Sequence, residues 1–68
     1  MKILLIDDQK LVLIPLANKL EEMGYKVTKT TNGIEGIELY DTVKPHLVIV
    51  DINMPTISGL EIVKYIRN

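Results

Sequence analysis

Several residue types are absent or scarce in this chain, and each absence removes a class of function. There is no cysteine and only one histidine among the 68 residues, which excludes disulfides and a structural zinc site. Tryptophan and phenylalanine are also absent, so three tyrosines supply all the aromatic surface. The net charge is only −1, which argues against broad electrostatic binding to nucleic acid. A hydrophobic content of 47% with few aromatics and many Ile, Leu and Val residues fits an α/β domain.

Long hydrophobic runs are missing as well. No apolar run approaches the ~20 residues that a membrane-spanning helix needs, and Met1-Lys2 leads into the first apolar run without a signal peptide. A chain without cysteine also suits a reducing compartment, so we expect a cytoplasmic protein with no membrane contact. At this length we expect a single domain, residues 1–68, which buries only about 60% of its unfolded surface and is marginally stable alone.

Aspartates follow two short apolar runs, and these are the most informative residues present. Residues 3–6 lead directly into Asp7 and Asp8, and residues 47–50 lead directly into Asp51. Four apolar residues rich in β-branched side chains indicate a buried strand. If the two strands are parallel neighbours, the three carboxylates meet at one edge of the sheet, where open α/β sheets place their ligands. Converging carboxylates repel one another unless a cation lies among them.

Strand and helix patterns alternate along the chain. Strands are predicted over 2–6, 25–30 and 47–50, and helices over 9–23, from 33 to about 43, and from 58 onward. Gly24 is placed as a helix-ending glycine, and Asn32 and Ser58 each precede a glutamate by three residues, as in capping boxes. Pro15 predicts a kink or a late start in the first helix. The expected inward faces are Leu13, Leu16, Ala17, Leu20 and Met23, then Ile37, Tyr40 and Val43, then Leu60, Val63 and Ile66.

The order β-α-β-α-β-α implies parallel strands joined by right-handed crossovers. Asp7-Asp8, Asp51-Ile52-Asn53-Met54-Pro55 with Gly59, Asn32-Gly33-Ile34-Glu35-Gly36 and Lys44-Pro45 together resemble the receiver domain of two-component response regulators. The resemblance covers the whole chain but only the N-terminal half of a receiver. It implies an α/β fold: a truncated flavodoxin-like (βα)3 three-layer sandwich with parallel sheet order 2-1-3.

The resemblance also implies roles for individual residues. Asp51 would be the phosphoacceptor, receiving a phosphoryl group from a sensor histidine kinase. Asp8 and Asp51 would ligate Mg²⁺ directly, Asp7 mostly through water, and Asn53 through its backbone carbonyl. Mg²⁺ suits this set because it prefers octahedral oxygen ligands and keeps several waters. The chain would then be a signalling module in a phosphorelay, not an enzyme.

Two departures from the family pattern leave alternatives open. The hydroxyl and lysine that follow the family's fourth and fifth strands have no counterpart here, so the half that senses the phosphate is expected to be absent. Strand three would become an exposed apolar edge, which natural sheets avoid. We therefore expect a homodimer through the strand-three edge. The alternative function is a non-switching, self-assembling receiver fragment or interaction module.

Simpler roles compete at individual positions. Asp8 could merely cap the first helix, because aspartate is a favoured N-cap residue. His46 is expected to be an exposed loop residue, and Gly33 and Gly36 are expected to serve turns and packing. A phosphohydrolase with an aspartyl nucleophile is disfavoured because Asn53 stands where that class has a second carboxylate. Leu11 and Ile14 lie off the predicted core face and indicate a possible contact surface.

Overall fold

The computed structural model describes residues 1–52, 54 and 58–67, and these form three strands alternating with three helices. All six predicted elements are present, with α1 one residue shorter at each end than expected and β2 beginning one residue later. The bounds are β1 (Lys2–Ile6), α1 (Lys10–Glu22), β2 (Lys26–Thr30), α2 (Gly33–Val43), β3 (Leu47–Val50) and α3 (Gly59–Arg67). Pro15 lies inside α1 without ending it.

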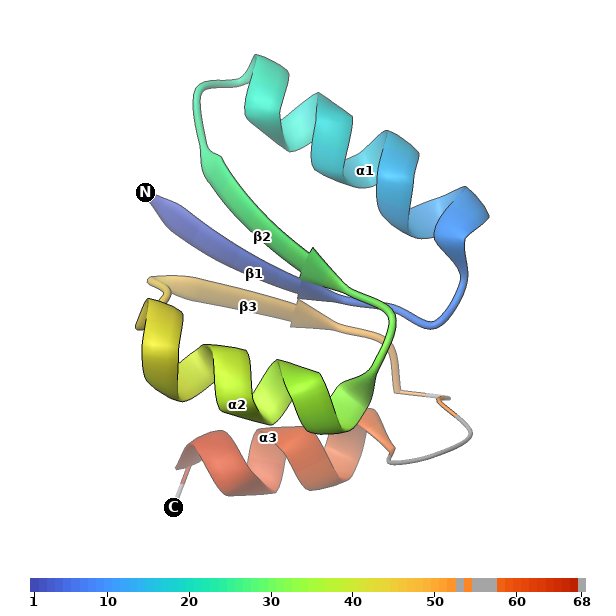
Figure 1. The fold of residues 1–68 in the computed structure, drawn as a ribbon, viewed down its shortest axis with the longest axis vertical. Coiled ribbons are helices and arrows are strands. Elements are labelled where there is room, and N and C mark those ends of the chain that lie inside the picture. The colour runs from blue at the N-terminus through green and yellow to red at the C-terminus, as the bar shows by residue number, and fades with distance from the viewer. Residues whose placement is uncertain (53, 55–57, 68) are drawn as a thin grey trace.

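The strands form one parallel sheet in the order β2-β1-β3, which the resemblance to receiver domains implies. Helix α1 covers one face of this sheet, whereas α2 and α3 lie side by side on the other (Figure 1). The carboxyl ends of all three strands point the same way, toward the loops that lead into the helices. This three-layer arrangement is the flavodoxin-like half-fold that the resemblance implies, and it agrees with the alternating order of strands and helices.

The core is centred on β1, whose residues 3–6 are at most 1% exposed. Because successive side chains alternate across a strand, β1 serves both helical layers. Leu4 and Ile6 pack with Met54 and Ile62 beneath α2 and α3, whereas Leu5 packs beneath α1. Each such buried aliphatic side chain contributes about 1.5–3 kcal/mol to folding.

Local capping follows the predicted residues, with one change of partner. The Asn32 side chain accepts the backbone N–H groups of Ile34 and Glu35 at 2.8 and 3.1 Å and so caps α2. The Glu35 carboxylate accepts the hydroxyl of Thr30 at 2.6 Å rather than completing a capping box. Thr30 Oγ1 in turn accepts the N–H of Asn32 at 3.1 Å. These bonds join the end of β2 to the start of α2.

Two predicted helix faces are partly wrong. Leu60 is 62% exposed, and the fully buried residue of α3 is Ile62. Gly59 lies against the backbone of residues 51–52, so the inward face of α3 comprises positions 59, 62, 63 and 66, and Leu60 turns outward.

In α1, only Leu13 and Ala17 are buried, whereas Leu16 and Met23 are 36% and 59% exposed. Among the described residues α1 is the only helix on its face of the sheet, so nothing flanks it and just a narrow line of its side chains is covered (Figure 1).

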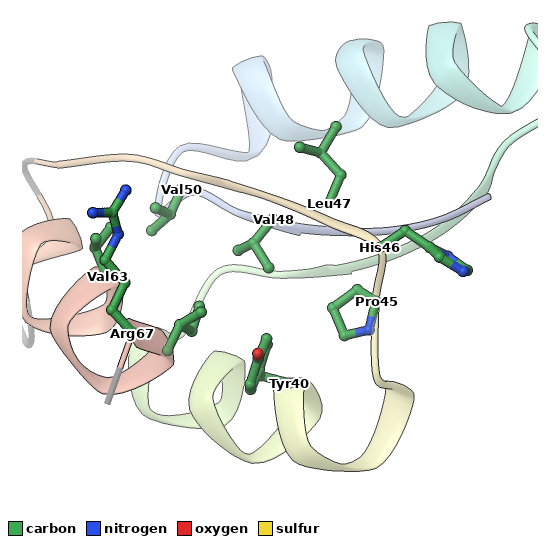
Figure 2. A pocket seen from close by; sticks show the side chains of 9 residues that line it. Tyr40, Pro45, His46, Leu47, Val48, Val50, Val63 and Arg67 are labelled. Carbon is green, nitrogen blue, oxygen red and sulfur yellow. The ribbon is translucent and has the colours of Figure 1, made fainter.

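Strand β3 is less buried than β1, the other strand made of consecutive apolar residues. Leu47 is 44% exposed and the other three residues are half-buried. No described strand pairs with its outer edge. A groove of about 290 Å³ runs beside it, lined by residues of β3, the end of α2 and α3, including Tyr40, Val48 and Arg67 (Figure 2). No helix in the described ranges has the length and apolar character to cross a membrane.

Candidate functional site

The register of the sheet places the three aspartates together. Ile6 of β1 is paired with Val50 of β3, so Asp7 and Asp51 are the next residues along two neighbouring strands. Backbone hydrogen bonds continue past the strands: the N–H of Asp51 donates to Ile6 at 2.9 Å, and the N–H of Asp7 donates to Thr30 at 3.2 Å. The hydrogen bonds of the sheet therefore also hold the backbone of Asp7 and Asp51, at the carboxyl ends of the strands.

Local contacts then orient the first two carboxylates. Asp7 Oδ1 accepts the N–H of Gln9 at 2.9 Å, an Asx-type turn that leads the chain into α1. Sequence reasoning missed this turn, although an aspartate two residues before a helix-starting residue is a usable signal. Asp8 does not cap α1, because Gln9 occupies the cap position and makes no side-chain cap bond. The simpler role considered for Asp8 is therefore wrong.

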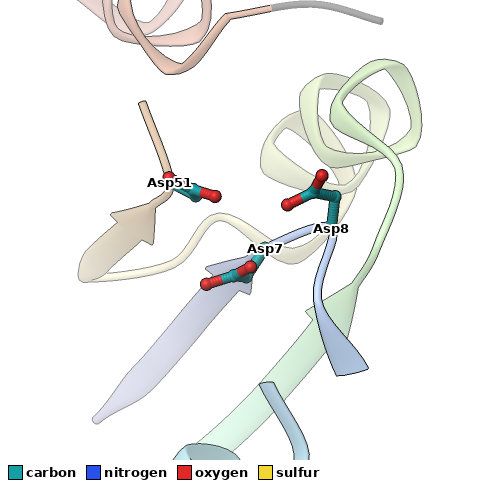
Figure 3. Close-up of side chains that lie close together, drawn as sticks. All are labelled: Asp7, Asp8 and Asp51. Carbon is teal, nitrogen blue, oxygen red and sulfur yellow. The ribbon is translucent and has the colours of Figure 1, made fainter. Parts of the chain in front are cut away.

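The carboxylates of Asp7, Asp8 and Asp51 converge in a half-buried cluster (Figure 3). One oxygen from each lies within 4.8 Å of the other two. Asp8 Oδ1 is buried and has no hydrogen-bond partner among the described groups. A buried oxygen of an acidic group without a donor costs free energy, and like charges at this spacing repel each other. Both costs are removed by a cation with oxygen ligands, so the residues present fit Mg²⁺.

The backbone of Asp51, which follows β3, is also held by a contact with the start of α3. A Cβ placed at Gly59 would overlap the carbonyl oxygen of Asp51 and would lie 2.7 Å from Cα of Ile52. Only glycine allows the start of α3 to approach this backbone so closely. The N–H of Gly59 donates to the carbonyl of Ile52 at 3.1 Å. The glycine that the sequence analysis assigned to a family motif is thus a packing residue of the site.

The other predicted site residues have different outcomes. Asn53, named as a backbone ligand, lies outside the described residues, as does Pro55 of the same loop. His46 is exposed, and its Nδ1 accepts the N–H of Lys2 at the opposite end of the sheet. Gly36 packs against Ile6, as expected of a packing glycine.

A cluster of this kind is suited to phosphoryl chemistry. A carboxylate can act as a covalent phosphoryl acceptor, and a bound cation neutralises the charge of the incoming phosphoryl oxygens. The fold and the acidic edge together therefore define a class: parallel α/β domains with a cluster of carboxylates at the carboxyl ends of neighbouring strands.

Comparison with known proteins identifies the family within that class. Residues 3–68 match the response regulator receiver domain, and the chain belongs to this family. The alkaline phosphatase synthesis transcriptional regulatory protein PhoP of Bacillus subtilis is 35% identical over 66 residues, which are 97% of this chain and 28% of that protein. The polar-differentiation response regulator DivK of Brucella anthropi is 30% identical over 97% of this chain and 54% of its own length.

Solved structures agree in fold. The response regulator TrrA of Thermotoga maritima, in complex with Mg(2+)-BeF, is 39% identical, with a TM-score of 0.91 over 97% of this chain and 57% of that one. The chemotaxis protein CheY4 of Vibrio cholerae gives a TM-score of 0.92 at 30% identity, over 97% of this chain and 55% of that one. The chain thus spans about half the length, or less, of these relatives, as expected from the resemblance. The family match favours the receiver interpretation over a non-switching interaction module.

Proposed function

We propose that this chain accepts a phosphoryl group on Asp51 and that Mg²⁺ held by Asp7 and Asp8, together with Asp51, assists the transfer. The observation that carries this proposal is the convergence of the three carboxylates at the carboxyl ends of β1 and β3. One buried oxygen of Asp8 there has no hydrogen-bond donor among the described groups. The role fits a phosphorelay component that receives a phosphoryl group rather than an enzyme that turns over a separate substrate.

In the transfer step, one carboxylate oxygen of Asp51 forms a bond to phosphorus. The phosphorus–nitrogen bond of a phosphohistidine donor breaks, and the imidazole leaves with the electron pair and takes a proton from water. Backbone bonds from β1 hold Asp51 in place for this attack. When bound, Mg²⁺ would neutralise negative charge on the phosphoryl oxygens.

A sensor histidine kinase is the proposed donor. TrrA, 39% identical to this chain, has been solved in complex with the histidine kinase ThkA, and separately with Mg(2+)-BeF. By similarity, these two complexes support a histidine kinase as the donor and Mg²⁺ as the cation. A cytoplasmic location fits such a partner and a chain without cysteine.

Phosphorylation can be tested without knowing the kinase. The folded chain is incubated with Mg²⁺ and acetyl phosphate, and intact mass is measured. We expect a gain of one phosphoryl group that is lost in Asp51→Asn and retained in Glu21→Gln, which changes an exposed carboxylate of α1. A folded chain that gains no phosphoryl group, or that gains it equally in Asp51→Asn, contradicts the proposal. Circular dichroism of each variant verifies the fold.

A further inference from the structure

Asn32 and Gly33, which connect β2 to α2, form an asparagine–glycine pair with a chemistry of its own. Because Gly33 has no Cβ, its backbone nitrogen can approach the side-chain amide carbon of Asn32 with little steric hindrance. Asn32 is exposed, so water reaches it. Asn18, the other described asparagine, is exposed too, but it precedes Lys19, whose side chain hinders the same approach. The pair is therefore a candidate site of covalent modification.

The reaction that this pair permits is deamidation through a cyclic imide. The Gly33 nitrogen loses its proton to a base in solution and forms a bond to Cγ of Asn32. The bond between Cγ and the side-chain nitrogen breaks, and ammonia leaves with a proton from water. Water then adds to one of the two ring carbonyl carbons and opens the ring. Opening at Cγ gives aspartate, whereas opening at the main-chain carbonyl carbon gives isoaspartate, so no oxidant or reductant takes part.

In the folded chain, three hydrogen bonds hold Asn32 in a conformation that cannot form this ring. Its Oδ1 accepts the N–H groups of Ile34 and Glu35 at 2.8 and 3.1 Å, and its main-chain carbonyl accepts that of Gly36 at 2.9 Å. Ring closure requires Cβ of Asn32 and the nitrogen of Gly33 to be nearly eclipsed about the Cα–C bond, and at the observed ψ of 121° they are far from eclipsed. The peptide must rotate and the side chain must leave the helix before the reaction can occur.

We infer that Asn32 is a site of spontaneous deamidation whose rate is controlled by the first turn of α2. The capped conformation protects the residue, and opening of the turn allows the reaction. Three hydrogen bonds of ordinary strength hold the closed form, so the folded chain should react about a hundredfold more slowly than the unfolded chain. This inference goes beyond phosphoryl acceptance and does not depend on it.

The two products have opposite effects on α2. Aspartate keeps the length of the side chain and can accept the same two N–H groups, and its charge is favourable at a helix N-terminus. Isoaspartate carries the main chain through the former side chain, so the oxygen that caps the helix is no longer placed over its first turn. One site thus yields a product that preserves the start of α2 and a product that opens it.

The reaction is measured on the full chain in mildly alkaline buffer, with and without guanidinium chloride. Tandem mass spectrometry follows the conversion of each asparagine. We expect Asn32 to convert about a hundredfold more slowly in the folded chain, and faster than Asn18 once the chain is unfolded. Asn32→Ser, which retains a capping oxygen, should lose most of the labelling by isoaspartate methyltransferase that the aged wild-type chain shows.

Two matched hydroxyl deletions test the role of the α2 turn. Thr30 Oγ1 accepts the N–H of Asn32 at 3.1 Å, so Thr30→Val should speed the reaction of the folded chain severalfold. Thr42→Val removes a hydroxyl that donates to the carbonyl of Glu38, toward the other end of the same helix, and should leave the rate unchanged. Circular dichroism verifies each fold. Glu35→Ala, which removes the exposed acceptor of the Thr30 hydroxyl, replaces Thr30→Val if that variant does not fold.

Two results would overturn the inference. One is an equal rate of conversion of Asn32 in the folded and the unfolded chain, which would mean that the turn gives no protection. The other is an unfolded chain in which Asn32 converts no faster than Asn18, which would mean that the following glycine confers no reactivity.

Discussion

Strands β1 and β3 have nearly interchangeable sequences and very different surroundings. Each contains four consecutive aliphatic residues followed by aspartate. In β1 these residues are at most 1% exposed, because strands lie on both sides and helices on both faces. In β3 they are half-buried or exposed, because one side of the strand is open within the described chain. An apolar run therefore predicts a strand, but its position in the sheet decides how much burial contributes to stability.

The largest expected effect comes from truncating the central strand. Leu4→Ala removes a side chain that is 0% exposed and should cost about 2–5 kcal/mol of unfolding free energy. The matched change Val48→Ala on the half-buried neighbour should cost about 1–2 kcal/mol in the monomer. Urea unfolding monitored by circular dichroism measures both. Equal costs at concentrations where the chain is monomeric would contradict the contrast between the strands.

Two glycines sharpen the comparison, because each lies against one of the strands or its continuation. Gly59→Ala forces a Cβ into the backbone of Asp51 and Ile52, which cannot move without shifting the end of β3. Gly36→Ala meets the side-chain end of Ile6 at 2.5 Å, which can adjust within the core. Both should destabilise by about 1–3 kcal/mol, with Gly59→Ala the costlier. The same unfolding assay decides, and the reverse order would show that the β1 core is the more rigid of the two.

The acidic residues that follow the strands provide the third test. Asp8→Asn removes one of three mutually repelling charges and should stabilise the metal-free chain by about 1 kcal/mol. It should also abolish most of the increase in melting temperature produced by Mg²⁺, because a neutral amide replaces the anionic carboxylate that would bind the cation. Thermal unfolding with and without Mg²⁺ measures both changes. Glu21→Gln should leave the increase in melting temperature with Mg²⁺ unchanged. An equal loss of that increase in Glu21→Gln would show that Mg²⁺ does not bind specifically at the aspartate cluster.

The smallest effect concerns the two helices beneath β1 and β3. The Tyr65 hydroxyl of α3 donates to Asp41 Oδ2 of α2 at 2.6 Å, and this hydrogen bond and the carboxylate charge raise the pKa of Tyr65 above 10.0. The folded chain thus holds the phenolic proton more tightly than the unfolded chain does. This stabilisation is present below about pH 10 and is lost as the pH rises through the raised pKa.

Asp41→Asn should therefore lower the pKa of Tyr65 toward its usual value, as followed by NMR titration of the tyrosine ring. Tyr65→Phe identifies the resonance. An unchanged titration in Asp41→Asn would mean that the hydrogen bond does not persist in solution.

Most of the fold was predictable because its determinants are local. The alternating runs, Gly24 and the Asn32 cap each act within a few residues, and all appear as expected. The three-aspartate cluster was also predictable, since parallel register brings strand ends together. The faces of α1 and α3 were less so. Leu60 turns outward because Gly59 packs against the backbone of residues 51–52. This tertiary contact cannot be predicted from the spacing of apolar residues along a helix.

The contact at Gly59 has a mechanical consequence. No side chain separates the first turn of α3 from the peptide that follows Asp51, so the two backbones are in direct contact. A shift of the backbone at Asp51 and Ile52 would therefore require a shift of Gly59 as well, because no side chain between them can adjust. The first turn of α3 and the backbone beside the acidic edge are thus in direct main-chain contact.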